Sequence, residues 1–143
     1  MRSNLFLALA FTIVLADSGK CMADDDLGKL QGTWILDSVE TKGEALPKDK
    51  IVRNTIVITG ERFAVMNDGK VQREVTFKLD SSKSPKWIDQ ILPGQDGQLV
   101  TRPGLYELNG DTLRLVFDRT RPVEIKASAD STLNITIYKR DKK

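Results

Sequence analysis

The sequence predicts an all-β fold, an antiparallel sandwich or closed barrel, and three observations favour it. From Gly32 onward, apolar and polar residues alternate with a period of two instead of the helical period of about 3.6 residues. Turn-forming pairs such as Asp68-Gly69 and Asn109-Gly110 interrupt this alternation at short intervals. The chain has 143 residues, a length that suits one domain with a substantial core.

The alternating segments are the expected strands. They cover residues 33–39, 55–59, 62–66, 71–79, 87–91, 105–108, 112–117, 123–126 and 133–138. Before them, residues 27–31 could form one helical turn capped by an aspartate. Residues 41–53 contain Gly43, Pro47 and charges of both signs, which predicts an irregular loop.

The first predicted hairpin has two possible turns, which differ in the faces they align. A three-residue loop at 67–69, with its glycine in the left-handed conformation, keeps Phe63 in line with Val75. It also sets Arg62 opposite Glu74 on the other face, which is a favourable cross-strand pair. A two-residue loop would mix apolar and polar residues on one face. The pattern therefore favours the three-residue loop.

The second predicted hairpin turns at the two-residue loop Gly110-Asp111. This loop places Glu107 across from Arg114, a pair of opposite charge. It also puts Tyr106 on the same face as other apolar residues of the two strands. Both hairpins then have one apolar face and one charged face, as a barrel wall requires.

The N-terminus has the pattern of a secretory signal peptide. A positive start at Arg2 is followed by residues 5–16, which carry no charge and are too few to span a membrane. Small residues before the bond after Ala23 suit cleavage there, and Lys20 beside Cys21 disfavours lipidation of that cysteine. We expect residues 1–23 to be removed. Residues 24–143 would then be an exported, periplasmic or extracellular barrel domain without a transmembrane segment.

Composition excludes several classes of chemistry. The chain has no histidine and one cysteine, so it can form neither a Ser-His or Cys-His pair nor an internal disulfide. The net charge of +2 is too small to indicate a nucleic-acid partner. No aspartate-rich calcium loop follows residues 24–26. We therefore expect no cofactor, no metal site, no nucleic acid and no catalytic constellation.

Several short stretches, in order along the chain, resemble a known family. They are Gly32-Thr33-Trp34, Pro85-Lys86-Trp87-Ile88-Asp89, 104–115, Arg121-Pro122 and 138–140. Together they are similar to the bacterial lipocalin-like domain family described largely from planctomycetes, and the Gly-x-Trp pattern is the one that opens the first lipocalin strand. The resemblance implies a lipocalin-like antiparallel up-and-down β-barrel of about eight strands, usually exported, with no assigned activity. It also implies that Arg140 lies over Trp34 and closes the barrel base, a structural role.

Residues 85–89 have two open interpretations. Lysine, tryptophan and aspartate together could form a recognition surface. Alternatively, Pro85 fixes the turn, Trp87 or Ile88 plugs one barrel end, and charges such as Asp89 face water.

The apolar faces of the strands are candidates for the lining of a ligand cavity. Such residues are Phe63, Val65, Val75, Phe77, Leu79, Tyr106, Leu113, Leu115, Phe117, Ile135 and Ile137. An eight-stranded barrel either fills its interior with these side chains or holds one small ligand, and both alternatives stay open. Arg73 lies on the same apolar parity, so it sits at the rim, pairs with a carboxylate or anchors an acidic ligand.

The functional expectation is an exported, monomeric, non-enzymatic binding module for a small apolar or amphipathic molecule. A first alternative is a packed barrel in the cell envelope that contacts unknown protein partners through residues 85–89 and 119–121. A second is a hydrolase that uses paired carboxylates, which need no histidine.

Overall fold

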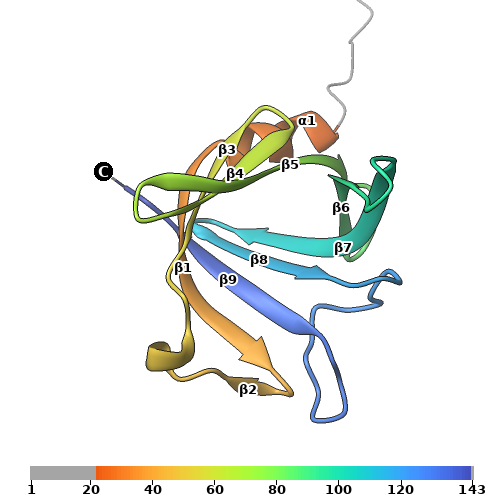
Figure 1. Ribbon diagram of the computed structural model, residues 1–143. Coiled ribbons are helices and arrows are strands. Elements are labelled where there is room, and N and C mark those ends of the chain that lie inside the picture. Colours follow the sequence, from red (N-terminus) through yellow and green to blue (C-terminus); the bar gives the residue numbers. More distant parts are fainter. Residues whose placement is uncertain (1–21, 143) are drawn as a thin grey trace, which may run out of the picture.

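The computed structural model describes residues 22–142. Over this range the chain is nearly all β, with a single α-helix, α1 (Met22–Leu30), and a single 3₁₀ turn, η1 (Lys48–Lys50). The strands are β1 (Gly32–Thr41), β2 (Glu44–Ala45), β3 (Thr55–Thr59), β4 (Arg62–Asn67), β5 (Lys70–Asp80), β6 (Lys86–Pro93), β7 (Leu99–Asn109), β8 (Thr112–Phe117) and β9 (Asn134–Arg140). The predicted antiparallel barrel is confirmed (Figure 1).

The sheet closes on itself. Each strand from β3 to β9 pairs antiparallel with the next, β1 pairs with β3, and the pairing of β1 with β9 completes the ring. β2 pairs only with the end of β1, so it lies outside the ring of eight strands. Because neighbouring strands run in opposite directions, the starts of β1 and β6 lie at the same end as the ends of β7 and β9.

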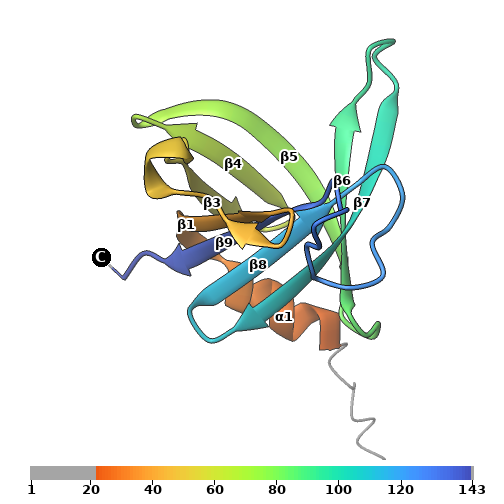
Figure 2. The ribbon, with the colours of Figure 1, turned by 90° about the horizontal axis from the view of Figure 1, so that it is seen from below.

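The two ends of the barrel differ. α1 lies across one of them, which we call the closed end (Figure 2). There the Gln31 side chain, next to α1, hydrogen-bonds both the N–H and the C=O of Gly60 in the β3–β4 turn. We call the opposite end, where β3, β5, β7 and β9 begin, the open end.

Apolar side chains pack on both sides of part of the barrel wall. The inner cluster fills the barrel and consists of Leu30, Trp34, Leu36, Ile56, Ile58, Phe63, Val75, Phe77, Ile88, Tyr106, Leu113, Leu115 and Tyr138. An outer cluster covers the far side of β7, β8 and β9 and consists of Leu105, Val116, Ala127 and Ile135. Residues 118–133, between β8 and β9, supply the cover.

Two predictions about this region are wrong. Residues 123–126 form no strand, because β8 pairs directly with β9 and leaves no sheet edge for another strand to join. Ile125 packs instead against the outer cluster, while Val123 is 85% exposed. Ile135 and Ile137 belong to the outer cluster and not to the barrel interior. Alternation pointed to the wrong face, because the apolar Ile135 and Ile137 are covered from outside by residues 118–133 while the polar Asn134 and Thr136 face the cavity.

The first hairpin also differs from its prediction. The turn has two residues, Asp68 and Gly69, both with positive φ (50° and 74°), and Asn67 lies opposite Lys70. A bulge in β5 then shifts the register by one residue, so that Phe63 still faces Val75. The apolar alignment is therefore confirmed, but the bulge provides it and the loop does not.

The bulge changes the charged pair as well. Arg62 lies opposite Thr76, not opposite Glu74 as expected. It still reaches the Glu74 carboxylate diagonally at 3.7 Å. In the second hairpin the predicted register is confirmed: Glu107 lies across from Arg114, with 3.5 Å between the charged groups.

Several elements are longer than expected. α1 has more than the single turn predicted at 27–31, and β7 begins at Leu99, six residues before the predicted start at Leu105. Of residues 41–53, expected to be irregular, some form β2 and η1.

Most of the predicted signal peptide lies outside the residues that the structure describes. Residues 1–21 of the expected signal peptide are not among the described residues, and Met22 and Ala23 form the start of α1. Across residues 22–142 the structure has no helix with the length and apolarity that a membrane crossing requires.

Candidate functional site

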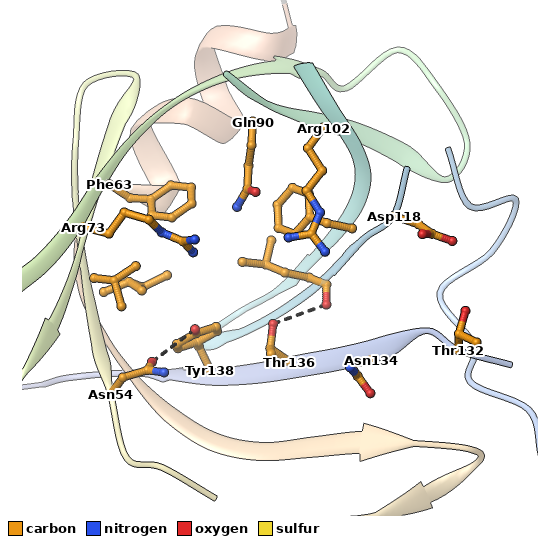
Figure 3. Close-up of a pocket in the computed structure, with 14 residues that line it drawn as sticks. Asn54, Phe63, Arg73, Gln90, Arg102, Asp118, Thr132, Asn134, Thr136 and Tyr138 are labelled. Carbon is orange, nitrogen blue, oxygen red and sulfur yellow. Dashed lines mark hydrogen bonds between the residues drawn. The ribbon is translucent and has the colours of Figure 1, made fainter. Parts of the chain in front are cut away.

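The open end contains a cavity of about 320 Å³, at the lower limit of typical small-molecule sites. Side chains from the seven strands β3 to β9 and from two loops surround it (Figure 3). Its lining residues are Asn54, Ile56, Phe63, Val65, Arg73, Gln90, Arg102, Leu115, Phe117, Asp118, Thr132, Asn134, Thr136 and Tyr138.

The floor of the cavity is apolar. Phe63 packs against Phe77 below it, with 5.8 Å between the ring centroids. Phe117 lies over Gly104, where a β-carbon would come within 2.4 Å of the Phe117 ring. The absence of a side chain at Gly104 therefore lets the aromatic ring lie against the wall of β7.

The structure divides the expected cavity residues into two groups. Phe63, Val65, Arg73, Leu115 and Phe117 line the cavity. The other expected residues lie deeper, in the packed interior: Val75, Phe77, Tyr106 and Leu113, each 2% exposed or less. The barrel thus combines the two alternatives left open by the sequence, because its closed half is filled and its open half is hollow.

The upper wall of the cavity carries two guanidinium groups. Arg73 at the start of β5 and Arg102 near the start of β7 lie at its solvent-exposed rim, and both point into it (Figure 3). Neither forms an ion pair with any residue from 26 to 142, whose side chains the structure describes. Arg102 lies 6.0 Å from the centroid of the Phe117 ring. The lining contains one carboxylate, Asp118, so positive charge is in excess.

Tyr138 provides a neutral hydrogen-bonding group on the side of the cavity formed by β9. Its hydroxyl donates to the side-chain oxygen of Asn54 at 3.2 Å. Burial raises the pKa of Tyr138 to about 12, although the nearby charge of Arg73 opposes this shift. The phenol is therefore protonated at neutral pH and adds no negative charge beside the arginines.

Gln90 is the most buried polar residue of the lining. It is 4% exposed, and its side-chain oxygen has no hydrogen-bond partner within the described chain. Sequence reasoning missed it, although a signal was present. Gln90 follows Ile88 by two residues in β6, so it occupies a core-facing position where an apolar residue is usual.

Most other polar residues of the cavity could not be found from the sequence. Asn54 and Thr132 lie in connections outside the strands, and Arg102 precedes the predicted start of β7. Asn134 and Thr136 lie on the face of β9 that alternation had assigned to solvent. These residues meet around one cavity only because the sheet closes into a ring.

At the closed end, the polar side chain of Asp26 in α1 has partners within the protein, unlike the arginines of the open end. Asp26 is 6% exposed and accepts hydrogen bonds from the Lys86 ammonium and the Tyr106 hydroxyl, each at 2.7 Å. Burial alone would raise the pKa of Asp26, but the hydrogen bonds from Lys86 and Tyr106 and the positive charges nearby outweigh it, and the pKa lies below its ordinary value. Asp26 is therefore an internal partner of Lys86 and Tyr106 and not an exposed carboxylate.

Arg140 and Trp34 complete this end. The guanidinium lies 4.2 Å from the centroid of the indole ring, in agreement with the contact that the family resemblance implies. Arg140 also donates to the backbone oxygens of Gln31, at 2.9 Å, and of Lys29. The indole N–H of Trp34 donates to Leu30. Gly32 has a φ of 117°, which its lack of a side chain permits.

Residues 85–89 use their charges within the molecule. Pro85 follows a cis peptide bond, and the next residue, Lys86, pairs with α1. Asp89 accepts a hydrogen bond at 2.7 Å from Arg121, whose guanidinium lies 3.8 Å from the ring of the half-buried Trp87. This arrangement is closer to the structural interpretation of the motif than to a recognition surface, although Trp87 lies on the outer wall and not at a barrel end.

No cluster of three or more metal-ligating side chains occurs in the part of the chain that the structure describes. Comparison with known proteins provides no identity: no family model, no curated protein and no solved structure matches the chain.

Proposed function

We propose that this protein binds a small amphipathic anion in the open end of its barrel. The observation that carries the proposal is the pair of arginines, Arg73 and Arg102, which face a cavity with an apolar floor and have no carboxylate partner in residues 26–142. A charged group at a cavity wall is stabilised by an opposite charge supplied by the ligand. The ligand's apolar part would cover Phe63, Val65 and Phe117.

The apolar floor and the two guanidinium groups would each contribute to the free energy of binding in a different way. Each methylene group buried on the apolar floor contributes about 0.8 kcal/mol. Hydrogen bonds between an acid and a guanidinium contribute about 1.5–3 kcal/mol. A chain of roughly eight carbons with an acidic head group therefore suits a cavity of this size and composition.

The resemblance to lipocalin-like domains and the N-terminal signal pattern support the same proposal. Barrels of eight strands can hold one small ligand, and we propose that this one does so after export. A purely structural barrel is less well supported, because the charges of residues 85–89 are engaged internally. A hydrolase with paired carboxylates is also less well supported, since Asp118 is the one acidic residue of the cavity lining.

The test is a calorimetric titration of the purified protein with octanoate, octyl phosphate and octanol. We expect at least one anion to bind, and the double variant Arg73→Gln/Arg102→Gln to weaken it by about tenfold or more. Octanol should bind both proteins alike. The two anions distinguish a carboxylate ligand from a phosphate.

The matched control is Arg62→Gln, which removes the same charge from the exposed face of β4. It should leave every affinity unchanged. Two results contradict the proposal: the absence of binding to any of these compounds, or loss of affinity for octanol and the anions to the same extent. Intrinsic fluorescence is not the readout, because neither Trp34 nor Trp87 lines the cavity.

A further inference from the structure

We infer that the acid held in the open end carries a hydroxyl group within one or two carbons of its carboxylate, so that the ligand class is a hydroxycarboxylic acid. This inference rests on the proposed function and deepens it. It starts from Gln90, a buried side chain that points into the cavity (Figure 3) and lacks a partner for its oxygen within residues 26–142.

An unpaired amide oxygen at this depth is unfavourable for the empty protein. The residue two positions earlier, Ile88, faces the same side and is packed in the inner cluster at 3% exposed. A leucine or methionine at position 90 would continue that packing without an unpaired polar atom. Because Gln90 does not optimise the empty barrel, its amide is suited to a group that arrives with the ligand.

The position of Gln90 specifies what that group must be. Gln90 and Arg102 are direct cross-strand partners on β6 and β7, so their side chains leave the sheet side by side on one face. An acid held by Arg102 would place its neighbouring carbons next to the amide. The Gln90 oxygen accepts hydrogen bonds, so the ligand must donate there. A hydroxyl next to the carboxylate donates and also remains an acceptor for the amide nitrogen.

An ordered water could occupy the same place, and ligand discrimination separates the two cases. A hydroxyl makes an eight-carbon acid more polar, which weakens binding in an apolar pocket. Tighter binding of the hydroxy acid therefore requires a hydrogen-bond partner in the site. A site that provides such a partner discriminates against the analogue that lacks the hydroxyl.

The experiment compares octanoate with 2-hydroxyoctanoate and 3-hydroxyoctanoate by calorimetry. We expect at least one hydroxy acid to bind about fivefold to tenfold more tightly than octanoate. Gln90→Leu should remove this preference and leave the affinity for octanoate within about twofold. The same variant should melt at an equal or higher temperature without ligand, because the unpaired oxygen is gone.

Gln72→Leu is the control, since it makes the same substitution at an exposed position in the bulge of β5. It should keep the preference for the hydroxy acid. Equal affinities for octanoate and both hydroxy acids, or a preference that persists in Gln90→Leu, would overturn the inference while the proposed function stands. If none of these acids binds, the inference fails, and the proposed function fails with it only when octyl phosphate does not bind either.

Discussion

The two ends of the barrel differ in whether their charged side chains have partners within the protein. At the closed end, Asp26, Lys86 and Tyr106 complete each other's hydrogen bonds, and Arg140 is engaged by Trp34 and backbone oxygens. At the open end, Arg73 and Arg102 have no ion-pair partner in the described chain. Polar groups at the first end stabilise the fold. The two arginines at the second end have no such partners, which is the physical basis for proposing a binding site there.

The largest effect should come from removing Asp26. Asp26→Ala leaves the buried Tyr106 hydroxyl and the Lys86 ammonium without their acceptor, so we expect a loss of about 2–3 kcal/mol in the free energy of unfolding at pH 7. Lys86 is 40% exposed, and solvent screening keeps its share of the loss small. Urea denaturation measures the change. Anion binding at the open end should survive wherever the variant is folded.

The pH dependence of the same variant provides a second check. Since the folded-state pKa of Asp26 is depressed, its contribution is complete above the unfolded pKa of about 3.9 and is lost as pH falls through the lower, folded value. The gap in stability between wild type and Asp26→Ala should therefore narrow below about pH 4. Asp130→Ala, at an exposed loop position, should show neither the loss nor the narrowing.

A smaller loss is expected when Arg140 is removed from the closed end. Arg140→Ala deletes the contact with Trp34 and two hydrogen bonds, which together contribute about 1–2 kcal/mol. The melting temperature should fall by a few degrees. Arg140→Lys keeps the charge but not the planar stacking, so it should fall in between. An unchanged melting curve for Arg140→Ala would show that the contact between Arg140 and Trp34 does not stabilise the fold.

The smallest effect on stability should come from the open end. Arg73→Gln/Arg102→Gln removes no internal ion pair, so the free energy of unfolding should change by less than about 0.5 kcal/mol. Thermal denaturation without ligand measures this change. A loss as large as that of Asp26→Ala would show that these arginines stabilise the barrel and that the contrast between its ends is false.

The barrel could be predicted from the sequence because alternation and turn residues act locally. The register of the second hairpin followed from Gly110-Asp111 and the charges beside it. The inward or outward direction of Ile135 could not be predicted, because residues distant in the chain cover the outside of β9. The bulge in β5 was hidden for a similar reason, since nothing near Gln72 distinguishes an extra residue in the strand from an extra residue in the loop.

The candidate site was predictable only in part. Its apolar floor and Arg73 follow from the strand pattern, but Asn54 and Asp118 reach the cavity from connections whose path no local rule specifies. Gln90 could have been found, because it breaks the apolar parity of β6. Polar residues at core-facing strand positions are therefore worth attention before a structure exists.

The pairing of β1 with β9 has a consequence for how the chain folds. Trp34 lies opposite Arg140, so the pairing that completes the ring joins its first strand along the chain, β1, to its last, β9. Such pairings form slowly, because a long loop must be closed first. Until β9 docks, β1 and β8 have open edges that could pair with other molecules. A chain that ends before Asn134 should therefore aggregate rather than form a smaller barrel.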